Sequence, residues 1–343
     1  MVSDNWYYQN MNNNKILVVG GAGYIGSFIV RALKDEGFIP VIFDSLETGH
    51  QEAIEGCKIY QGNLQKDTEL LDKVFKTEKP VGVIHFAAYI EVGESVENPQ
   101  KYFFNNVFGT LNLLKAMINN QVLKIVFSST AATYGEPVKI PIDEDDPKKP
   151  TNPYGETKLT VEKILSWYSQ AYGLKAIALR YFNACGAALD GNYGQDYPRP
   201  THLINIACRI AMDEKKSFQI NGNDFPTPDG TCLRDYIHVL DLASAHIAAF
   251  KSLMEDQTGF RVYNVGTGEG YSVMEVVKMV KEISGVNFAS PAGPRRPGDP
   301  ARLVAKIDKI KKELGWEPKY SDLKTIVESA WKWHKSHPQG YSK

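Results

Sequence analysis

A tyrosine and a lysine four residues apart form the pattern in this chain with the clearest chemical potential. Tyr154 and Lys158 follow Pro153 in a segment with helical apolar spacing, and proline is favoured in the first turn of a helix. Residues four apart share a helix face, so the ammonium can stabilise the tyrosine phenolate and lower its pKa from about 10. Such a pair can take a proton from a substrate hydroxyl group.

The tyrosine–lysine pattern alone is common, and a surface pair without a catalytic role is its ordinary interpretation. A catalytic role is favoured by Ser128, Ser129 and Thr130, which directly follow a short apolar run. If that run is a strand of an open parallel sheet, these hydroxyl groups lie at its carboxyl end, where such sheets bind ligands.

Residues 15–44 have the parts of a dinucleotide-binding βαβ unit. An apolar run leads into Gly20, Gly23 and Gly26, after which a helical pattern and a second apolar run end at Asp44. Glycines permit a tight turn and close approach to a pyrophosphate, and the helix N-terminus attracts phosphate. Asp44 would accept hydrogen bonds from a ribose diol, which favours NAD over NADP. We therefore expect bound NAD; a glycine-rich turn without a ligand is the alternative.

Strands alternate with helices in the first half of the chain, which predicts an α/β fold with an open parallel sheet covered on both sides. Further strands are expected at 58–60, 81–86 and 124–127. Helices are expected at 67–76, capped by Asp67, and at 99–119. His85 and His238 lie in or beside apolar runs and are interpreted as core histidines.

Composition excludes several classes of function. The 343 residues carry a net charge of -1, which gives no field to attract nucleic acid or an anionic membrane. The four cysteines show no C-x-x-C spacing and no metal site is expected. No apolar run approaches the roughly 20 residues of a membrane span, and residues 1–14 lack the features of a secretory signal. We expect a soluble cytoplasmic protein with a mobile extension at residues 1–14.

Taken together, the glycine turn, the Ser/Thr cluster and the tyrosine–lysine pair resemble the extended short-chain dehydrogenase/reductase family. Longer strings at 85–88, 92–95, 105–107, 180–183, 234–239 and 337–341 are similar to its UDP-glucose (UDP-galactose) 4-epimerase branch, and the resemblance extends from Lys15 to about Tyr341. It implies interconversion of UDP-galactose and UDP-glucose. Hydride would pass from sugar C4 to tightly bound NAD, the 4-keto intermediate would rotate, and the hydride would return.

The resemblance also implies a role for individual residues. Tyr154 would be the base, Lys158 would hold the nicotinamide ribose and tune Tyr154, and Thr130 would bond the reacting hydroxyl. The residues expected to bind the cofactor are Gly20, Gly23, Tyr24, Ile25, Gly26, Asp44, Ser45, Asn63, Leu64, Phe86, Ala87, Ala88, Asn105, Ser128, Tyr154, Lys158 and Tyr181. The residues expected to bind the UDP-sugar are Thr130, Asn183, His202, Leu203, Arg234, Tyr236, Arg296, Asp299 and Leu303.

The resemblance further implies a Rossmann-type doubly wound parallel sheet with a smaller mixed α/β substrate domain. We expect residues 15–182 to form the NAD-binding domain and residues 183–343 to form mainly the UDP-sugar domain, with 236–265 returning to the large sheet. A homodimer is expected. Leu303 stands where some relatives carry a bulky Tyr, which leaves open the acceptance of UDP-GlcNAc and UDP-GalNAc.

Three alternatives differ in the chemistry they require. Another UDP-sugar 4-epimerase, acting on UDP-GlcNAc, UDP-glucuronate or a UDP-pentose, would use the same machinery. A nucleotide-sugar 4,6-dehydratase would need an Asp-Glu pair after Thr130, where this chain has Ala131 and Ala132. A non-catalytic dinucleotide sensor would be expected to lack Tyr154 and Lys158.

Overall fold

The computed structural model describes residues 14–197, 200–213, 217–255, 259–296 and 299–341. The extension predicted at residues 1–14 lies, apart from Asn14, outside the described residues. Contacts divide the chain into two compact units, each made of several segments. Unit 1 comprises Met1–Ser129, Glu156–Ala178 and His246–Arg261, and unit 2 comprises Thr130–Gly155, Leu179–Ala245 and Val262–Lys343.

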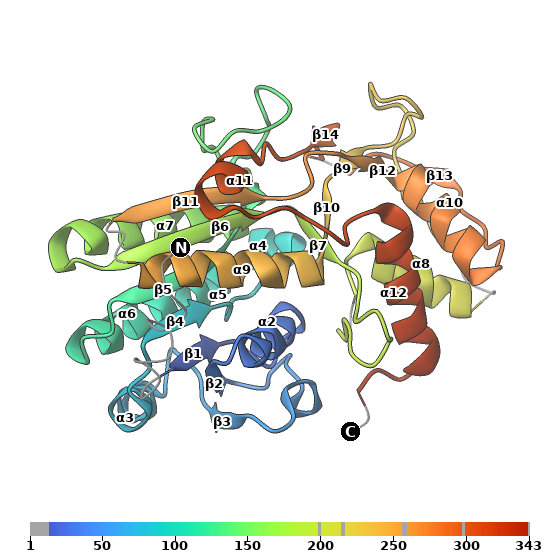
Figure 1. Ribbon diagram of the computed structural model, residues 1–343. Helices are drawn as coiled ribbons and strands as arrows, with labels where there is room; N and C mark the ends of the chain where they lie inside the picture. Colours follow the sequence, from blue (N-terminus) through green and yellow to red (C-terminus); the bar gives the residue numbers. More distant parts are fainter. Residues whose placement is uncertain (1–13, 198–199, 214–216, 256–258, 297–298, 342–343) are drawn as a thin grey trace. The chain divides into compact units, whose positions relative to one another are not determined.

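A seven-stranded sheet has the strand order β11-β6-β5-β4-β1-β2-β3. Its strands are β1 (Lys15–Val19), β2 (Ile39–Asp44), β3 (Lys58–Gln61), β4 (Gly82–His85), β5 (Lys124–Thr130), β6 (Lys175–Tyr181) and β11 (Phe260–Val265) (Figure 1). The pairs β1–β2, β2–β3, β1–β4 and β4–β5 are parallel. The order reverses at β1, so the doubly wound α/β fold predicted from the sequence is confirmed.

The helices around this sheet follow the expected pattern of strand and helix in alternation. They are α2 (Tyr24–Asp35), α3 (Thr68–Glu78), α4 (Val92–Glu97), α5 (Pro99–Tyr102), α6 (Gly109–Asn119), α7 (Pro153–Tyr172) and α9 (Val239–Met254). Short 3-10 turns occur at Gln51–Ile54 and Ala131–Thr133. Strand β1 is buried because Ile16, Leu17, Val18 and Val19 are all fully inaccessible, as expected for a central parallel strand.

Two expectations about the helices need correction. The helix predicted at 99–119 contains a π-helical stretch, Phe103–Phe108, between α5 and α6, a feature that apolar spacing does not reveal and that is frequent at functional sites. Asp67 precedes α3 as predicted, but its carboxylate makes no capping bond. The Asp67 carboxylate accepts instead from the backbone N–H of Asn63 at 2.7 Å, because this N–H group, in the turn before α3, also needs an acceptor.

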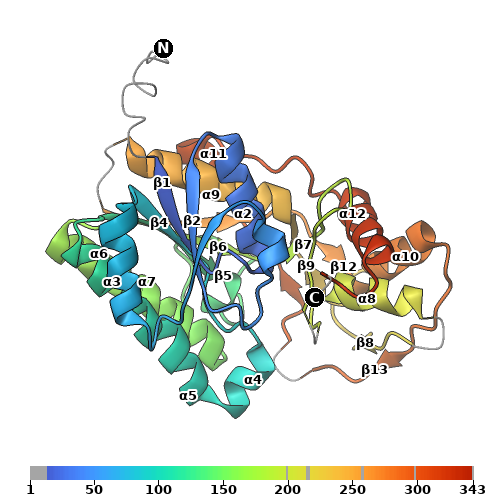
Figure 2. The same ribbon diagram turned by 90° about the horizontal axis from the view of Figure 1, so that it is seen from below.

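Unit 2 contains a layer of three helices and several short strands. The helices α8 (Leu203–Met212), α10 (Val273–Ser284) and α12 (Leu323–Ser336) pack side by side (Figure 2). Their shared apolar core includes Ile204, Val277 and Ile326. Also present are α11 (Asp308–Leu314), β7 (Asn183–Cys185), β8 (Ile220–Asn221), β9 (Leu233–Arg234), β10 (Tyr236–His238), β12 (Tyr271–Ser272), β13 (Ala292–Gly293) and β14 (Arg302–Leu303).

The segment 236–265, which was expected to return to the large sheet, contains the strands β10 and β11, and these belong to two different sheets. Strand β11 is a member of the large sheet, whereas β10 pairs with β7 in a sheet of two strands. The assignment of NAD binding to residues 15–182 and of UDP-sugar binding to residues 183–343 stays a prediction.

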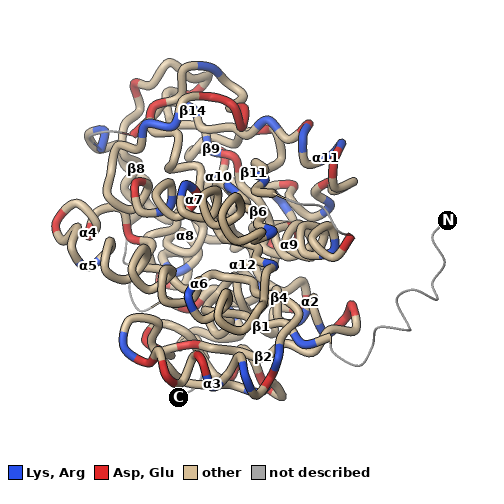
Figure 3. Tube along the Cα trace, turned by 90° about the vertical axis from the view of Figure 1, so that its left-hand side faces the viewer, with Lys and Arg blue, Asp and Glu red and all other residues tan. Residues whose placement is uncertain are grey.

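Charged residues of both signs are interspersed along the described trace (Figure 3), in keeping with the net charge of -1. Within the described part of the chain, no helix is long and apolar enough to cross a membrane.

Candidate active site

The glycine turn between β1 and α2 has no room for side chains at two of its positions. Gly20 has a φ of +81°, and a Cβ there would lie 2.5 Å from the backbone nitrogen of Ala87. A Cβ at Gly26 would lie 2.3 Å from the carbonyl oxygen of Gly20. These contacts require glycine, as the sequence predicted for a tight turn and for close helix–strand packing.

Gly23 differs from the other two glycines because its α-carbon faces open space. A Cβ there would meet only the carbonyl oxygen of Gly20, at 3.6 Å. Gly23 is also the N-cap of α2, a helix of 12 residues, and no side chain caps that end. The predicted contacts Tyr24 and Ile25 form the first turn of this helix. The turn therefore fits the pyrophosphate of a dinucleotide, which needs close backbone approach and free N–H groups.

Asp44 ends β2 beside this turn and is largely buried. Its two carboxylate oxygens accept from the backbone N–H groups of Ala22 and Leu46, both at 2.9 Å. Burial raises the pKa of Asp44, and these two backbone bonds oppose that rise. A carboxylate can accept about four hydrogen bonds, so two remain for a ribose diol.

The other expected cofactor contacts within unit 1 occupy strand ends and turns. Asn63 accepts from the backbone N–H of Gln65 at 2.8 Å, and the side chain of Gln65 donates to Asn105 at 2.8 Å. Asn105 lies in the π-helical stretch. The remaining residues in such places are Ser45 after β2, Leu64 after β3, and Phe86, Ala87 and Ala88 after β4.

The predicted catalytic pair lies in the first two turns of α7, which begins at Pro153 as expected. Tyr154 is 8% exposed and Lys158 is 3% exposed. The ammonium of Lys158 donates to the carbonyl oxygen of Ser128 at 2.8 Å and lies 4.9 Å from the ring centre of Phe127. A buried lysine fixed in this way differs from the surface pair that is the ordinary interpretation of the motif.

The Ser/Thr cluster forms the last residues of β5, which extends three residues beyond the strand expected at 124–127. Thr130 is largely buried, and its hydroxyl oxygen accepts from the backbone N–H of Ala132 at 3.2 Å. That oxygen keeps its own proton and can still donate a hydrogen bond to a ligand. Tyr181, another predicted cofactor contact, ends β6.

Burial sets the protonation of the charged groups near β4 and β5. It lowers the pKa of Lys158 to about 7, an effect that the charge of Glu162 opposes. Burial and the nearby charge of Lys158 lower the pKa of His85 to about 3, so His85 is neutral. His85 Nε2 and the Thr110 hydroxyl share a hydrogen bond of 2.9 Å, which supports its interpretation as a core histidine.

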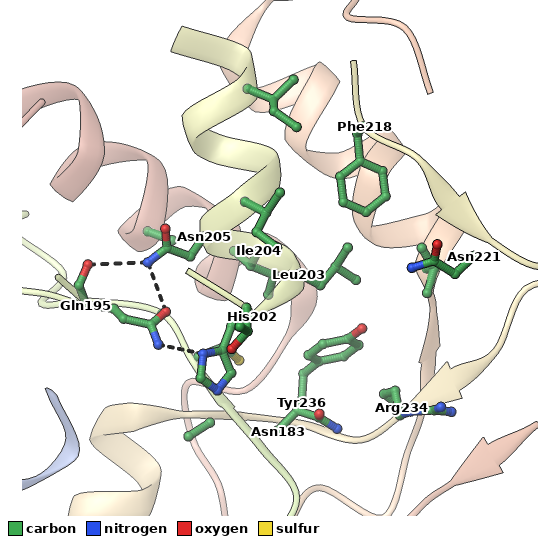
Figure 4. Close-up of a pocket in the computed structure, with 18 of the residues that line it drawn as sticks. Asn183, Gln195, His202, Leu203, Ile204, Asn205, Phe218, Asn221, Arg234 and Tyr236 are labelled. Atoms are coloured by element: carbon green, nitrogen blue, oxygen red, sulfur yellow. Dashed lines mark hydrogen bonds between the residues drawn. The ribbon is translucent and has the colours of Figure 1, made fainter. Parts of the chain in front are cut away.

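Unit 2 contains a pocket of about 400 Å³. It includes seven of the predicted substrate contacts, namely Asn183, His202, Leu203, Arg234, Tyr236, Arg296 and Asp299. Figure 4 shows the labelled side chains of Asn183, Tyr236, Leu203 and His202 around the cavity. Two predicted contacts, Thr130 and Leu303, do not line it.

Two arginines and one aspartate give the pocket a cationic end. Arg234 Nη2 lies 3.2 Å from Asp299 Oδ1, and Arg296 Nε lies 3.8 Å from Asp299 Oδ2. Arg234 also donates through Nη1 to the carbonyl oxygens of Leu233 and Pro300, at 2.8 and 2.9 Å. These contacts fix the guanidinium of Arg234, and two positive groups against one carboxylate favour an anionic ligand.

The opposite part of the pocket is organised by neutral amides. Gln195 Nε2 and His202 Nδ1 share a hydrogen bond of 2.9 Å, and Asn205 donates to the Gln195 side chain at 3.1 Å (Figure 4). Burial lowers the pKa of His202, which keeps its ring neutral at pH 7. His202 caps α8 by position, without a side-chain capping bond.

Several lining residues were missed by the sequence analysis. Gln195, Asn205, Phe218, Gln219 and Asn221 all line the pocket. Most of them lie in irregular segments or in strands of two residues, where hydrophobic periodicity gives no signal. Leu303 instead packs against the small cluster of Ala131, Tyr134 and Ile142, which includes the residue that follows Thr130.

The described residues contain no group of three or more His, Cys, Asp or Glu side chains that could hold a metal ion.

Known proteins resemble this chain over nearly its whole length. Residues 17–329 match the family model described as GDP-mannose 4,6 dehydratase. The UDP-glucose 4-epimerase of Halalkalibacterium halodurans is 51% identical over 328 residues, which cover 95% of this chain and 97% of the relative.

Two solved structures are similar in fold as well as in sequence. The UDP-glucose 4-epimerase from Brucella ovis in complex with NAD has a TM-score of 0.90 and 45% identity, covering 93% of this chain and 97% of that one. The UDP-glucose 4-epimerase from Bifidobacterium longum in complex with NAD+ and UDP has a TM-score of 0.89 and 38% identity. That match covers 95% of this chain and 100% of the other.

Proposed function

Because the chain belongs to the UDP-glucose 4-epimerases of the extended short-chain dehydrogenase/reductase family, we propose that it interconverts UDP-galactose and UDP-glucose at sugar C4. It is an NAD-dependent isomerase. The observation that carries the proposed chemistry is the buried Lys158, fixed by the Ser128 carbonyl one helical turn after Tyr154.

The residues that would hold NAD are those of the glycine turn together with Asp44, Asn63 and Asn105. The open side of Gly23 and the uncapped start of α2 fit a pyrophosphate. Asp44 retains acceptor capacity for a ribose diol, and its charge disfavours a 2′-phosphate. NAD, when bound, supplies a hydride acceptor that makes oxidation at sugar C4 reversible.

Tyr154 is proposed to move the proton of the sugar 4-hydroxyl group. The Lys158 ammonium stabilises the phenolate form of Tyr154, which lets the tyrosine accept that proton near neutral pH. Thr130 is proposed to bond the same hydroxyl group and to orient it. After the 4-keto sugar has rotated, hydride would return to the other face of C4, and Tyr154 would return the proton to the 4-oxygen.

The pocket of unit 2 is proposed to hold the UDP moiety. Arg234 and Arg296 would bind the pyrophosphate through paired charge-assisted hydrogen bonds. Asp299 lies against both guanidinium groups and would keep them aligned before the ligand arrives. Binding energy from this part of the substrate then positions the sugar for reaction.

The family model carries the name of a dehydratase, yet the site lacks the groups that dehydration needs. Loss of water requires an acid and a base beside the hydride acceptor, and methyl groups stand at both Ala131 and Ala132. A non-catalytic sensor is also disfavoured, because Tyr154 and Lys158 are both present and buried.

The range of sugars accepted is proposed to depend on Leu303. This side chain packs against the cluster of Ala131, Tyr134 and Ile142, of which Ala131 directly follows Thr130, and is shorter than the tyrosine of some relatives. We propose that UDP-glucose and UDP-galactose are the main pair and that UDP-GlcNAc and UDP-GalNAc are also accepted. UDP-glucuronate and UDP-pentoses are the alternative substrates.

We also propose a cytoplasmic homodimer. Unit 1 exposes apolar side chains on α4 and the π-helical stretch, with Val96 at 61% and Phe104 at 53%. Val92, Phe103 and Phe108 are exposed as well. A cluster of this kind is typical of a protein–protein contact. Sedimentation equilibrium should give twice the chain mass of 38.3 kDa.

The function is tested by incubating the purified protein with a panel of UDP-sugars and no added cofactor. Chromatography then resolves the C4 epimers. UDP-galactose should yield UDP-glucose, and acid-denatured protein should release about one NAD per chain. If UDP-galactose yields no UDP-glucose and no other UDP-sugar of the panel yields its C4 epimer, the proposal is overturned.

A further inference from the structure

Glu162 is a buried carboxylate to which the reaction described above gives no role. It lies one turn beyond Lys158 on α7 and two turns beyond Tyr154, so the three side chains share one face of the helix. Glu162 and Lys158 are each only 3% exposed. Glutamate is rarely buried to this degree unless another group balances its charge.

Two neighbouring residues of β5 hold two successive turns of α7. The Ser129 hydroxyl donates to Glu162 Oε1 at 2.5 Å, and the Ser128 carbonyl accepts from Lys158 at 2.8 Å. Ser129 is fully buried. All four residues belong to unit 1. The carboxylate is therefore fixed at a defined place near the lysine, rather than free to turn toward water.

Among the described residues, two elements place titratable groups near Lys158. On α7 these are Tyr154 and Glu162, and the charge of Glu162 raises the pKa of Lys158 against the effect of burial. On β4 the group is His85, which is neutral because its pKa is lowered to about 3. Strand β5 contributes the Ser128 carbonyl and the Phe127 ring, which carry no full charge.

We propose that Glu162 is a positioning residue for the epimerase reaction, because its buried carboxylate keeps the Lys158 ammonium charged beside Tyr154. The inference rests on the proposed function and extends it to a residue that touches neither sugar nor cofactor. Without this carboxylate, Lys158 would lose its proton at a lower pH, and Tyr154 would lose the charge that stabilises its phenolate.

The test is the pH dependence of kcat/KM for UDP-galactose in Glu162→Gln. Glutamine has the same shape, and its amide oxygen can still accept from the Ser129 hydroxyl, so the variant should fold. Loss of the negative charge should shift the alkaline limb of the profile to lower pH by about one unit. A merely structural role would change the height of the profile and not its position.

Two further variants separate charge from structure. Glu162→Asp keeps the charge and should keep the alkaline limb within about half a unit of the wild type. Glu156→Gln removes one negative charge from the same helix, two residues before Lys158 and on a different face. This variant should leave the alkaline limb of the profile in place.

If Glu162→Gln does not fold, the double variant Ser129→Ala/Glu162→Leu removes both hydrogen-bonding partners together, which is better tolerated than removing one.

The outcomes distinguish this inference from the proposed function. A wild type that epimerises no UDP-sugar overturns the proposed function itself. An active wild type whose alkaline limb coincides with that of Glu162→Gln, or of the folded double variant, overturns only the role of Glu162. An equal shift in Glu156→Gln overturns it too, because the effect would then be general to the charge of α7.

Discussion

Lys158 on α7 donates a hydrogen bond of 2.8 Å to the backbone carbonyl of Ser128 on β5. A backbone acceptor does not depend on a side-chain rotamer, so the place of the ammonium is set by the packing of the helix on the strand. Because Tyr154 is four residues earlier on the same helix, the register of α7 against β5 also determines where the proposed base lies.

Replacing Tyr154 with phenylalanine removes the proposed base and leaves the ring. We expect kcat to fall by at least about 100-fold, a typical contribution of a positioned base. Binding of UDP, measured by calorimetry, should change little because the pocket of unit 2 is intact. Near-normal turnover in this variant would contradict the mechanism.

Replacing Lys158 with methionine keeps the apolar stem and removes the ammonium. The hydrogen bond to Ser128 and the support of the nicotinamide ribose are both lost, so we expect a slower reaction and weaker retention of NAD. The retention of NAD is measured as the amount of NAD that stays with the protein after gel filtration. Lys163→Met on the exposed side of the same helix is the matched control and should retain NAD like the wild type.

Glu78 is expected to make a pH-dependent contribution to stability. Burial opposes ionisation, but hydrogen bonds from Lys15, Lys58 and Tyr60 lower the pKa of Glu78 to about 2. A carboxyl group with a depressed pKa stabilises the fold above its unfolded pKa of about 4.3, and this stabilisation is lost as the pH falls toward 2.

Glu78→Gln should therefore lower the free energy of unfolding by about 2 kcal/mol at pH 7. The difference from the wild type should shrink as the pH falls from about 4.5 toward 2. Denaturant unfolding at several pH values measures both effects. Glu328→Gln, which breaks an exposed pair with Lys324, should change stability by less than about 0.5 kcal/mol. A constant difference at all pH values would contradict the assignment to Glu78.

Leu303→Tyr is expected to narrow the range of substrates. A larger side chain against the cluster of Ala131, Tyr134 and Ile142 should reduce kcat/KM for UDP-N-acetylgalactosamine by at least about 10-fold, while UDP-galactose is affected much less. The ratio of the two constants, compared between wild type and variant, is the measurement. If the ratio does not change, Leu303 does not contact the sugar 2-substituent.

The parts of the fold that repeat a simple pattern could be predicted from the sequence. Strand β1, the glycine turn and Asp44 are adjacent in the chain, and each glycine position follows from backbone sterics alone. The start of α7 at Pro153 was predicted for a similar local reason. The π-helical stretch Phe103–Phe108 was not, because one additional residue in a turn leaves the apolar pattern almost unchanged.

The candidate site could be predicted only in part, since its members come from distant segments. The resemblance supplied Arg234 and Asp299, which are 65 residues apart and lie 3.2 Å from each other. No local pattern connects Gln195 with His202, or predicts that Phe218 and Asn221 line the same pocket, because the pocket exists only once the short strands and α8 have packed. The role proposed for Glu162 depends likewise on its contact with Ser129, 33 residues away.

We expect the hydrogen at sugar C4 to leave as hydride and to return within one turnover. UDP-galactose labelled with deuterium at C4 tests it most directly, with the wild-type protein, no added cofactor and mass spectrometry of the product. We predict that UDP-glucose keeps the deuterium at C4, and that unlabelled substrate takes up none from deuterated water. Loss of the label to solvent, or uptake of deuterium at C4, would rule out the return of the same hydride to C4.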